Sequence, residues 1–221
     1  MNISLSRRLR TAADYVREGA VTADIGCDHG KLSAFLLQSK KAPFVYAGDI
    51  RPLPLQKAQQ LLAHLGLQEK SRCLCTNGLE GMPGSEIEDV VIAGLGCDVI
   101  ASVITAAPWL KHSSKHLILV PASKHPDLRR FLAAEGFATL KEEAVCEMGH
   151  CYTVILAAYS GEVRQLSERE AQLGCMDLTT DDGAKYLAAV TARMQRVLQQ
   201  AGDRQSAGTK AAAEFLHGER E

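Results

Sequence analysis

The sequence lacks three features that would place it in a specialised class of protein. No apolar run in its 221 residues approaches the roughly 18 residues that a membrane-spanning helix needs. The first ten residues are polar and basic, without the apolar segment of a secretory signal. With 25 basic and 26 acidic residues, the formal net charge is -1, which argues against a polybasic nucleic-acid binder. We therefore expect a cytoplasmic protein in which any basic surface is local.

The cysteines give no sign of a disulfide framework or a metal site. There are seven, an odd number, and no export signal precedes them. Cys73 and Cys75 lie two positions apart, but no second pair stands at zinc-ribbon spacing. We expect reduced thiols that act as small apolar side chains, and no bound metal.

Short apolar runs alternate with amphipathic segments through residue 160. The expected strands cover residues 20–25, 44–49, 71–76, 89–94 and 116–120, and the expected helices cover 5–18, 31–39, 53–65, 98–106 and 126–135. Residues 137–146 and 151–158 then read as an antiparallel hairpin. This order predicts an α/β fold with a Rossmann-like, seven-stranded sheet. The closing hairpin is typical of class I methyltransferases and is usually missing from nicotinamide dehydrogenases.

The chain changes character after Gly161. Residues 182–200 carry apolar side chains at helical spacing, residues 202–208 are polar, and Lys210–His217 reads as a last short helix. The sequence therefore predicts two domains, a sheet domain over residues 1–160 and a small helical, coiled-coil-like domain over residues 161–221.

The first two expected strands end in acidic residues. Asp24, Gly26, Asp28 and Gly30 form a turn into a helix, where glycines let a ligand approach the backbone closely. Carboxylates there repel a pyrophosphate but suit the cationic amino-acid part of S-adenosylmethionine. Asp49, 25 positions after Asp24 at the end of the second strand, is suited to accept both hydroxyls of a ribose.

Two further turns complete the predicted cofactor site. Asn77 and Gly78 follow the third strand, where an amide can lie beside an adenine ring. The run Ala93-Gly94-Leu95-Gly96 follows the fourth strand. Because the carboxyl ends of parallel strands meet at one edge of a sheet, these turns are expected to converge on one ligand.

Taken together, these motifs resemble the TrmK family, bacterial tRNA methyltransferases that methylate N1 of the adenine at tRNA position 22. The matching stretches are 5–9, 23–29, 47–49, 77–79, 92–96, 128–137 and 152–155, with Leu173-Gly174 and Tyr186-Leu187 in the tail. The resemblance implies S-adenosyl-L-methionine as cofactor and tRNA as partner, with residues 161–221 contacting the tRNA. It departs from the family at Cys97, where a glycine is usual, and at Val120-Pro121-Ala122, where the family usually has Gln-Pro-Asn.

The resemblance and the turns together give a set of candidate site residues. The candidates for cofactor binding are Asp24, Gly26, Asp28, Gly30, Asp49, Ile50, Asn77, Gly78, Ala93 and Gly94. The catalytic candidates are Asp28, His29 and Gly94, and the substrate-binding candidates are Arg7, Arg8, Leu95, Gly96, Pro121 and Tyr152. Structural alternatives stay open: His29 as a hydrogen-bonding group of the turn, Asp28 as a partner for the cofactor's ammonium, and Tyr152 as core.

The turn after the fourth strand favours a ring nitrogen as the methyl acceptor. Enzymes that methylate an exocyclic amine commonly carry an Asn/Asp-Pro-Pro-Tyr/Phe turn there, and this chain has Ala93-Gly94-Leu95-Gly96. The alternatives are a different RNA or a small molecule as substrate, or a cofactor-binding module that has lost its substrate site at Val120-Pro121-Ala122.

Basic residues gather at three places that would surround the site. These are Arg7-Arg8-Arg10, the segment 111–124 with His112, His116 and His125, and Arg129-Arg130; the tail adds Lys185, Arg193, Arg196, Arg204 and Lys210. The functional interpretation is a rim that contacts RNA phosphates, and the alternative is a solvated face, which is what most charge runs are.

Overall fold

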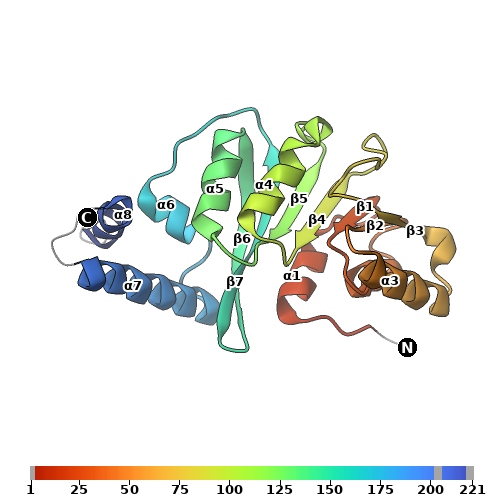
Figure 1. Cartoon of the computed structure of the whole chain (residues 1–221), viewed down its shortest axis with the longest axis horizontal. Helices are drawn as coiled ribbons and strands as arrows, with labels where there is room; N and C mark the ends of the chain where they lie inside the picture. The colour runs from red at the N-terminus through yellow and green to blue at the C-terminus, as the bar shows by residue number, and fades with distance from the viewer. Residues whose placement is uncertain (1–2, 202–205, 218–221) are drawn as a thin grey trace.

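The computed structural model describes residues 3–201 and 206–217, and within these ranges seven strands form one sheet (Figure 1). The strands are β1 Thr22–Ile25, β2 Val45–Asp49, β3 Ser71–Cys75, β4 Asp89–Ala93, β5 His116–Val120, β6 Phe137–Glu147 and β7 His150–Tyr159. Their order is β3-β2-β1-β4-β5-β7-β6; β1 to β5 run parallel, and β7 pairs antiparallel with β5 and β6. The predicted sheet is therefore confirmed.

The helices occupy the segments between these strands and the C-terminal tail. They are α1 Arg7–Tyr15, α2 Lys31–Gln38, α3 Pro52–His64, α4 Cys97–Thr105, α5 His125–Ala134, α6 Glu168–Leu173, α7 Asp181–Ala201 and α8 Ala207–His217, with short 3-10 turns at Gln68–Lys70 and Pro108–Leu110. None of the helices in the described ranges is long and apolar enough to cross a membrane.

Helix α6 is the element that the sequence analysis did not place. Its signal was present, because Ser167 and Glu170 form a capping box: the Glu170 N–H donates to Ser167 Oγ at 3.2 Å, and the Ser167 N–H donates to the Glu170 carboxylate at 2.8 Å. The predicted helix 210–217 lies within α8, which begins at Ala207 and so also takes in the last residues of the predicted loop 202–208. Residues 202–205 of that loop lie outside the described residues.

The sheet is buried on both faces by helices, so alternate residues of one strand enter different cores. Val90 and Ile92 of β4 pack with α4 and α5 in one layer, while Val91 packs with α1 and α2 in the other. The chain passes from β1 through β2 to β3 on one side and continues at β4 on the other side of β1. The strand order thus reverses between β1 and β4, where open α/β sheets bind ligands.

The β6–β7 hairpin corrects the prediction for the cysteines. Its register sets Cys146 opposite Cys151, and the two form a disulfide. The prediction of reduced thiols is wrong for this pair, because a strand register and not a sequence motif brings the two together. Cys75 and Cys175 are exposed, so they do not act as buried apolar side chains either.

The tail has an apolar core of its own that continues onto the hairpin. Leu173, Met176, Tyr186, Val190, Met194, Ala212 and Phe215 form this core, and Ala144 and Cys151 of the hairpin pack against it. Helix α6 also packs against α5 (Figure 1). The boundary between two domains at residue 160 stays a prediction.

A buried ion pair joins the sheet to the tail. Arg129 of α5 donates from Nε and Nη2 to Glu142 Oε1 of β6 at 2.9 and 2.7 Å. Its Nη1 donates to the carbonyls of Ala171 and Gln172 at the end of α6, at 2.7 and 3.0 Å. Gly174 follows with φ +62°, and a Cβ there would collide with the Glu142 carboxylate. Arg129 is 3% exposed, so the prediction that it belongs to an RNA-binding rim is wrong.

Replacing Arg129 tests whether this pair is structural. Arg129→Met is expected to lower the free energy of unfolding by about 3–5 kcal/mol, because Glu142 becomes a buried charge without its partner. Arg129→Met/Glu142→Met is expected to lose less than the single variant, since both charges are removed together. Urea denaturation followed by circular dichroism measures both. A single-variant loss below about 1 kcal/mol, the usual range for a surface pair, would contradict the assignment.

Candidate active site

A cavity of about 920 Å³ opens at the carboxyl ends of the parallel strands. Its lining includes most of the residues predicted for the site: Arg8, Asp24, Gly26, Asp28, His29, Asp49, Ile50, Asn77, Gly78, Ala93, Gly94 and Leu95. The candidates that do not line it are Arg7, Gly30, Gly96, Pro121 and Tyr152. The four turns that the sequence set apart are therefore neighbours in space, while the roles of their residues stay predictions.

The turn between β1 and α2 is held close to β2. The N–H groups of Gly26 and Cys27 both donate to the Gly48 carbonyl, at 2.8 and 3.0 Å. Gly26, Asp28 and Gly30 all have positive φ, and Asp28 at +48° is unusual for a residue with a side chain. Gly30 does not touch the cavity, but a Cβ on it would lie 2.8 Å from the Cβ of Ala58, so glycine lets α2 begin directly against α3.

Asp49 connects the end of β2 to this turn. One carboxylate oxygen accepts the Asp28 N–H at 3.2 Å, and the other accepts the Arg51 N–H at 2.8 Å and Nε at 3.3 Å. Burial opposes ionisation of Asp49, but these hydrogen bonds and the Arg51 charge lower its pKa below the usual range. Asp49 is therefore an ionised acceptor at neutral pH, and it lies in the wall of the cavity.

Asp24 and Asp28 occupy different depths of the cavity. Asp24 is buried and accepts a hydrogen bond from Ser33 Oγ at 2.7 Å, and burial raises its pKa to about 6. The Asp28 side chain is 59% exposed, with Oδ1 3.7 Å from His29 Nε2 and 3.6 Å from Arg51 Nη2. A cationic ligand group thus has one carboxylate near the cavity floor and a second at its rim.

The mouth of the cavity is partly apolar. Ile50 and Val99 line it and are 63% and 49% exposed, which is high for large apolar side chains. Gly94 has φ +77°, and no heavy atom lies within 4 Å of the place where a Cβ would stand. The cavity therefore offers apolar contacts for an aromatic ring and an unobstructed backbone at Gly94.

Arg8 and Tyr152 meet at the edge of the cavity. The Arg8 guanidinium lies 4.4 Å from the centre of the Tyr152 ring, and Arg8 Nη1 donates to Glu147 at 3.0 Å. Tyr152 is only partly buried, so it is not a core residue. Arg7 lies elsewhere, because Nη2 donates to Asp182 at 2.7 Å and Nη1 to the Cys146 carbonyl at 2.9 Å.

The two remaining substrate-binding candidates, Gly96 and Pro121, lie beside the cavity and not in its lining. Gly96 is the N-cap of α4, and Pro121 is buried in the turn after β5. Of the departures from the family pattern, Val120 is buried at the end of β5 and Ala122 is exposed.

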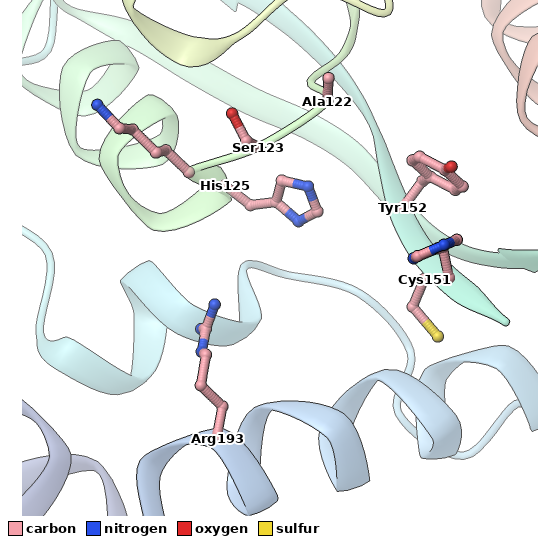
Figure 2. A pocket seen from close by; sticks show the side chains of 8 residues that line it. Ala122, Ser123, His125, Cys151, Tyr152 and Arg193 are labelled. Carbon is pink, nitrogen blue, oxygen red and sulfur yellow. The ribbon is translucent and has the colours of Figure 1, made fainter. Parts of the chain in front are cut away.

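A smaller cavity, of about 490 Å³, lies beside the first (Figure 2). Figure 2 labels Ala122 and Ser123 from the segment between β5 and α5, His125 from the start of α5, Cys151 and Tyr152 from β7, and Arg193 from α7. This group was not predicted from the sequence, because its members come from three distant segments without a shared motif. The available signals were the basic residues of segment 111–124 and those of the tail, which include Arg193. In the parts of the chain that the structure describes, no group of three or more His, Cys, Asp or Glu residues is placed to hold a metal.

The comparisons with known proteins agree with this geometry. Residues 5–155 match the family model for a methyltransferase domain. A Bacillus subtilis protein, tRNA (adenine(22)-N(1))-methyltransferase, is 34% identical over 155 residues. That alignment covers 70% of this chain and 65% of the relative, so the chain spans just under two thirds of the relative's length.

Two solved structures have the same fold over almost the whole chain. The Bacillus subtilis m1A22 tRNA methyltransferase TrmK has a TM-score of 0.79 and 26% identity, with 98% of this chain and 96% of that one covered. A Streptococcus pneumoniae protein solved in complex with S-adenosyl-L-methionine has a TM-score of 0.82 and 26% identity, with 97% and 100% covered.

The fold, the cavity at the strand switch and the matched domain define a class I methyltransferase. Within that class, the chain belongs to the TrmK family, and the likeness to solved structures includes the helical tail.

Proposed function

We propose that this protein acts in the cytoplasm and transfers the methyl group of S-adenosylmethionine to N1 of an adenine in tRNA, at position 22 as in the Bacillus subtilis relative. The observation that carries the proposal is the larger cavity, in which Asp24, Asp49 and the open backbone at Gly94 surround one space.

The cavity residues fit each part of the cofactor. Asp49 is an ionised acceptor for the two ribose hydroxyls. Ile50 and Val99 offer apolar contacts to the adenine ring, and Asn77 offers its amide to the ring edge. Asp24 and Asp28 face the ammonium of the amino-acid part. When bound, S-adenosylmethionine supplies a methyl group on a sulfonium, which is already an activated electrophile.

The protein's main contribution to this reaction is positioning. Adenine N1 carries an in-plane lone pair outside the aromatic sextet, so it attacks without prior loss of a proton, and orientation accounts for much of the rate. Backbone carbonyls of the turn Ala93–Gly96 are placed to accept hydrogen bonds from the exocyclic amine. Because Gly94 has no neighbour within 4 Å of its Cβ position, a base can approach the backbone there.

Asp28 and His29 lie at the rim where the base would enter. The transfer moves positive charge from the sulfonium to the methylated ring, and an exposed carboxylate at the rim stabilises that charge. N1 is paired in a helical RNA, so the target base has to be unpaired or extruded, at a cost of a few kcal/mol.

Asp49→Ala tests the ribose contact. The affinity for S-adenosylmethionine is expected to fall roughly 10- to 100-fold, because the ligand loses hydrogen bonds to a charged acceptor and the Asp28 turn loses an anchor. Isothermal titration calorimetry measures it, with Asp14→Ala, an exposed carboxylate on α1, as the control. Unchanged affinity in Asp49→Ala would mean that the ribose lies elsewhere.

The raised pKa of Asp24 predicts a pH dependence of cofactor binding. Asp24 is ionised above pH 6 and protonated below it, so the attraction for an ammonium is present at pH 7 and lost as the pH falls toward 5. The dissociation constant of the wild type is expected to rise up to about tenfold for each pH unit below 6. Asp24→Asn should bind weakly with little dependence on pH between 5 and 6.5. A wild-type affinity that is flat over this range would refute the ammonium contact.

The reaction itself is tested with the full chain, because α6 supplies the carbonyl partners of the buried Arg129. Methyl-labelled S-adenosylmethionine is incubated with bulk bacterial tRNA, and the digested RNA is expected to contain labelled 1-methyladenine. A transcript with adenine at position 22 should be labelled, and the same transcript with guanine there should not. Label in N6-methyladenine would refute the ring-nitrogen mechanism. No label in RNA despite cofactor binding would favour a small-molecule substrate or a binding module.

A further inference from the structure

The smaller cavity lies next to the larger one, because residues that line one contact residues that line the other at two places. Ala122 lines the smaller cavity and Leu95 lines the larger one, and the N–H of Ala122 donates to the carbonyl of Leu95 at 2.9 Å. On the hairpin side, Tyr152 lines the smaller cavity while Arg8, whose guanidinium lies 4.4 Å from the Tyr152 ring, lines the larger. Nucleotides that flank a base in the larger cavity are therefore within reach of the smaller one.

The smaller cavity is basic and holds no carboxylate in its lining. Lys124 is one of its two permanent cations, but its Nζ is 2.7 Å from Asp98, which neutralises much of that charge. Arg193 is the other, and its Nη2 donates to the neutral amide oxygen of Gln172. Among the residues that the structure describes, no acidic side chain pairs with Arg193. Arg193 thus presents an uncompensated positive charge to the cavity.

His125, which lines the cavity together with His150, adds structure rather than charge. Burial, reinforced by the charges of Arg129 and Arg193, lowers the pKa of His125 to about 4, so its ring is neutral at pH 7. The ring bonds the Tyr186 hydroxyl of α7 at 3.3 Å and the backbone of Pro121. His125 therefore holds the loop after β5 against α7, which fixes Arg193 relative to Ala122 and Tyr152.

We propose that this cavity binds the nucleotide next to the target adenine in the RNA, with Arg193 contacting its phosphate and Tyr152 stacking on its base. The proposal rests on the proposed function, because it takes the RNA from that reaction. The cavity volume of about 490 Å³ is in the range of sites for drug-sized ligands and is much larger than a free phosphate needs. Tyr152 and Arg193 come from β7 and α7 and stand apart across the cavity, as a base and its phosphate require (Figure 2).

Single-stranded RNA is commonly recognised in this way. Unstacked bases pack on aromatic side chains, and their backbone phosphates contact arginine or lysine. Arg8 on Tyr152 adds a cation to the same stack, which strengthens it. The tail then contributes a residue to the substrate site itself, and does not act only as a remote contact surface.

The test compares Arg193→Gln with Arg196→Gln in the full-length protein. Both variants remove one arginine from α7, but Arg196 lies outside the cavity and donates to the Ala192 carbonyl of its own helix. Arg193→Gln is expected to raise KM for tRNA roughly tenfold with little change in kcat. The variant loses a charged contact that stabilises the bound substrate and the transition state equally, so binding weakens while the chemical step keeps its rate. The slope of log Kd for tRNA against log salt should shrink by about 0.7–0.9, which corresponds to one phosphate.

Three controls keep the result interpretable. The affinity for S-adenosylmethionine and the melting temperature should match the wild type in both variants. Arg196→Gln should leave KM and the salt slope unchanged, and Arg193→Lys should keep the salt slope because it keeps the charge.

The outcomes separate this proposal from the reaction on which it rests. If the wild type labels tRNA but Arg193→Gln has the wild-type KM and salt slope, the nucleotide site is refuted and the function stands. A loss of kcat at unchanged KM would also refute it, since Arg193 would then act on the target base in the transition state. If the wild type labels no tRNA, the proposed function fails and this site fails with it.

Discussion

The ion pair between Arg129 and Glu142 is the contact through which the sheet and the tail become one structure. Arg129 uses two nitrogens for the carboxylate and a third for two carbonyls at the end of α6, while the second oxygen of Glu142 accepts the Cys175 N–H at 3.3 Å. Desolvating two charges is costly, and this arrangement offsets the cost by satisfying nearly all of their hydrogen-bonding groups. Tyr186 of α7 is joined to this pair as well, because Arg129 Nη2 also donates to its hydroxyl at 3.3 Å.

The active site depends in a similar way on a single carboxylate. Asp49 orients the turn that carries Asp28 and His29, and it also faces the cavity where a ribose would bind. One group therefore has a structural task in the free protein and a ligand task in the complex. In the turn, Asp28 has a positive φ and its N–H donates to Asp49, so this hydrogen bond helps to hold the unusual backbone conformation.

Much of the fold and the larger cavity was predictable from the sequence, for a local reason. Apolar runs that end in Asp24, Asp49, Asn77 and Gly94 mark the strands and their carboxyl ends together, and a parallel sheet brings those ends to one edge. The resemblance to the TrmK family, rather than the pattern, supplied the substrate. The features that were missed depend on pairings far apart in sequence: the burial of Arg129 beside Glu142, the register that joins Cys146 to Cys151, and the approach of Arg193 to Tyr152.

Ion pairs reduce the charge that some basic residues can offer to RNA. Arg7 is paired with Asp182 and Lys124 with Asp98, whereas Arg193 donates to the neutral amide of Gln172. A basic residue in the sequence is therefore not by itself evidence for an RNA contact.

Helix α1 shows when the site becomes complete during synthesis of the chain. It packs against β5 and β7, and Arg8 lies on Tyr152 and bonds Glu147, 139 residues further along. Helix α1 leaves the ribosome first, but it can make these contacts only after the hairpin of β6 and β7 has been synthesised. Until the hairpin has been made, Arg8 at the edge of the larger cavity lacks both Glu147 and Tyr152 as partners. Contacts of such long range also favour slow folding relative to a protein stabilised by local contacts.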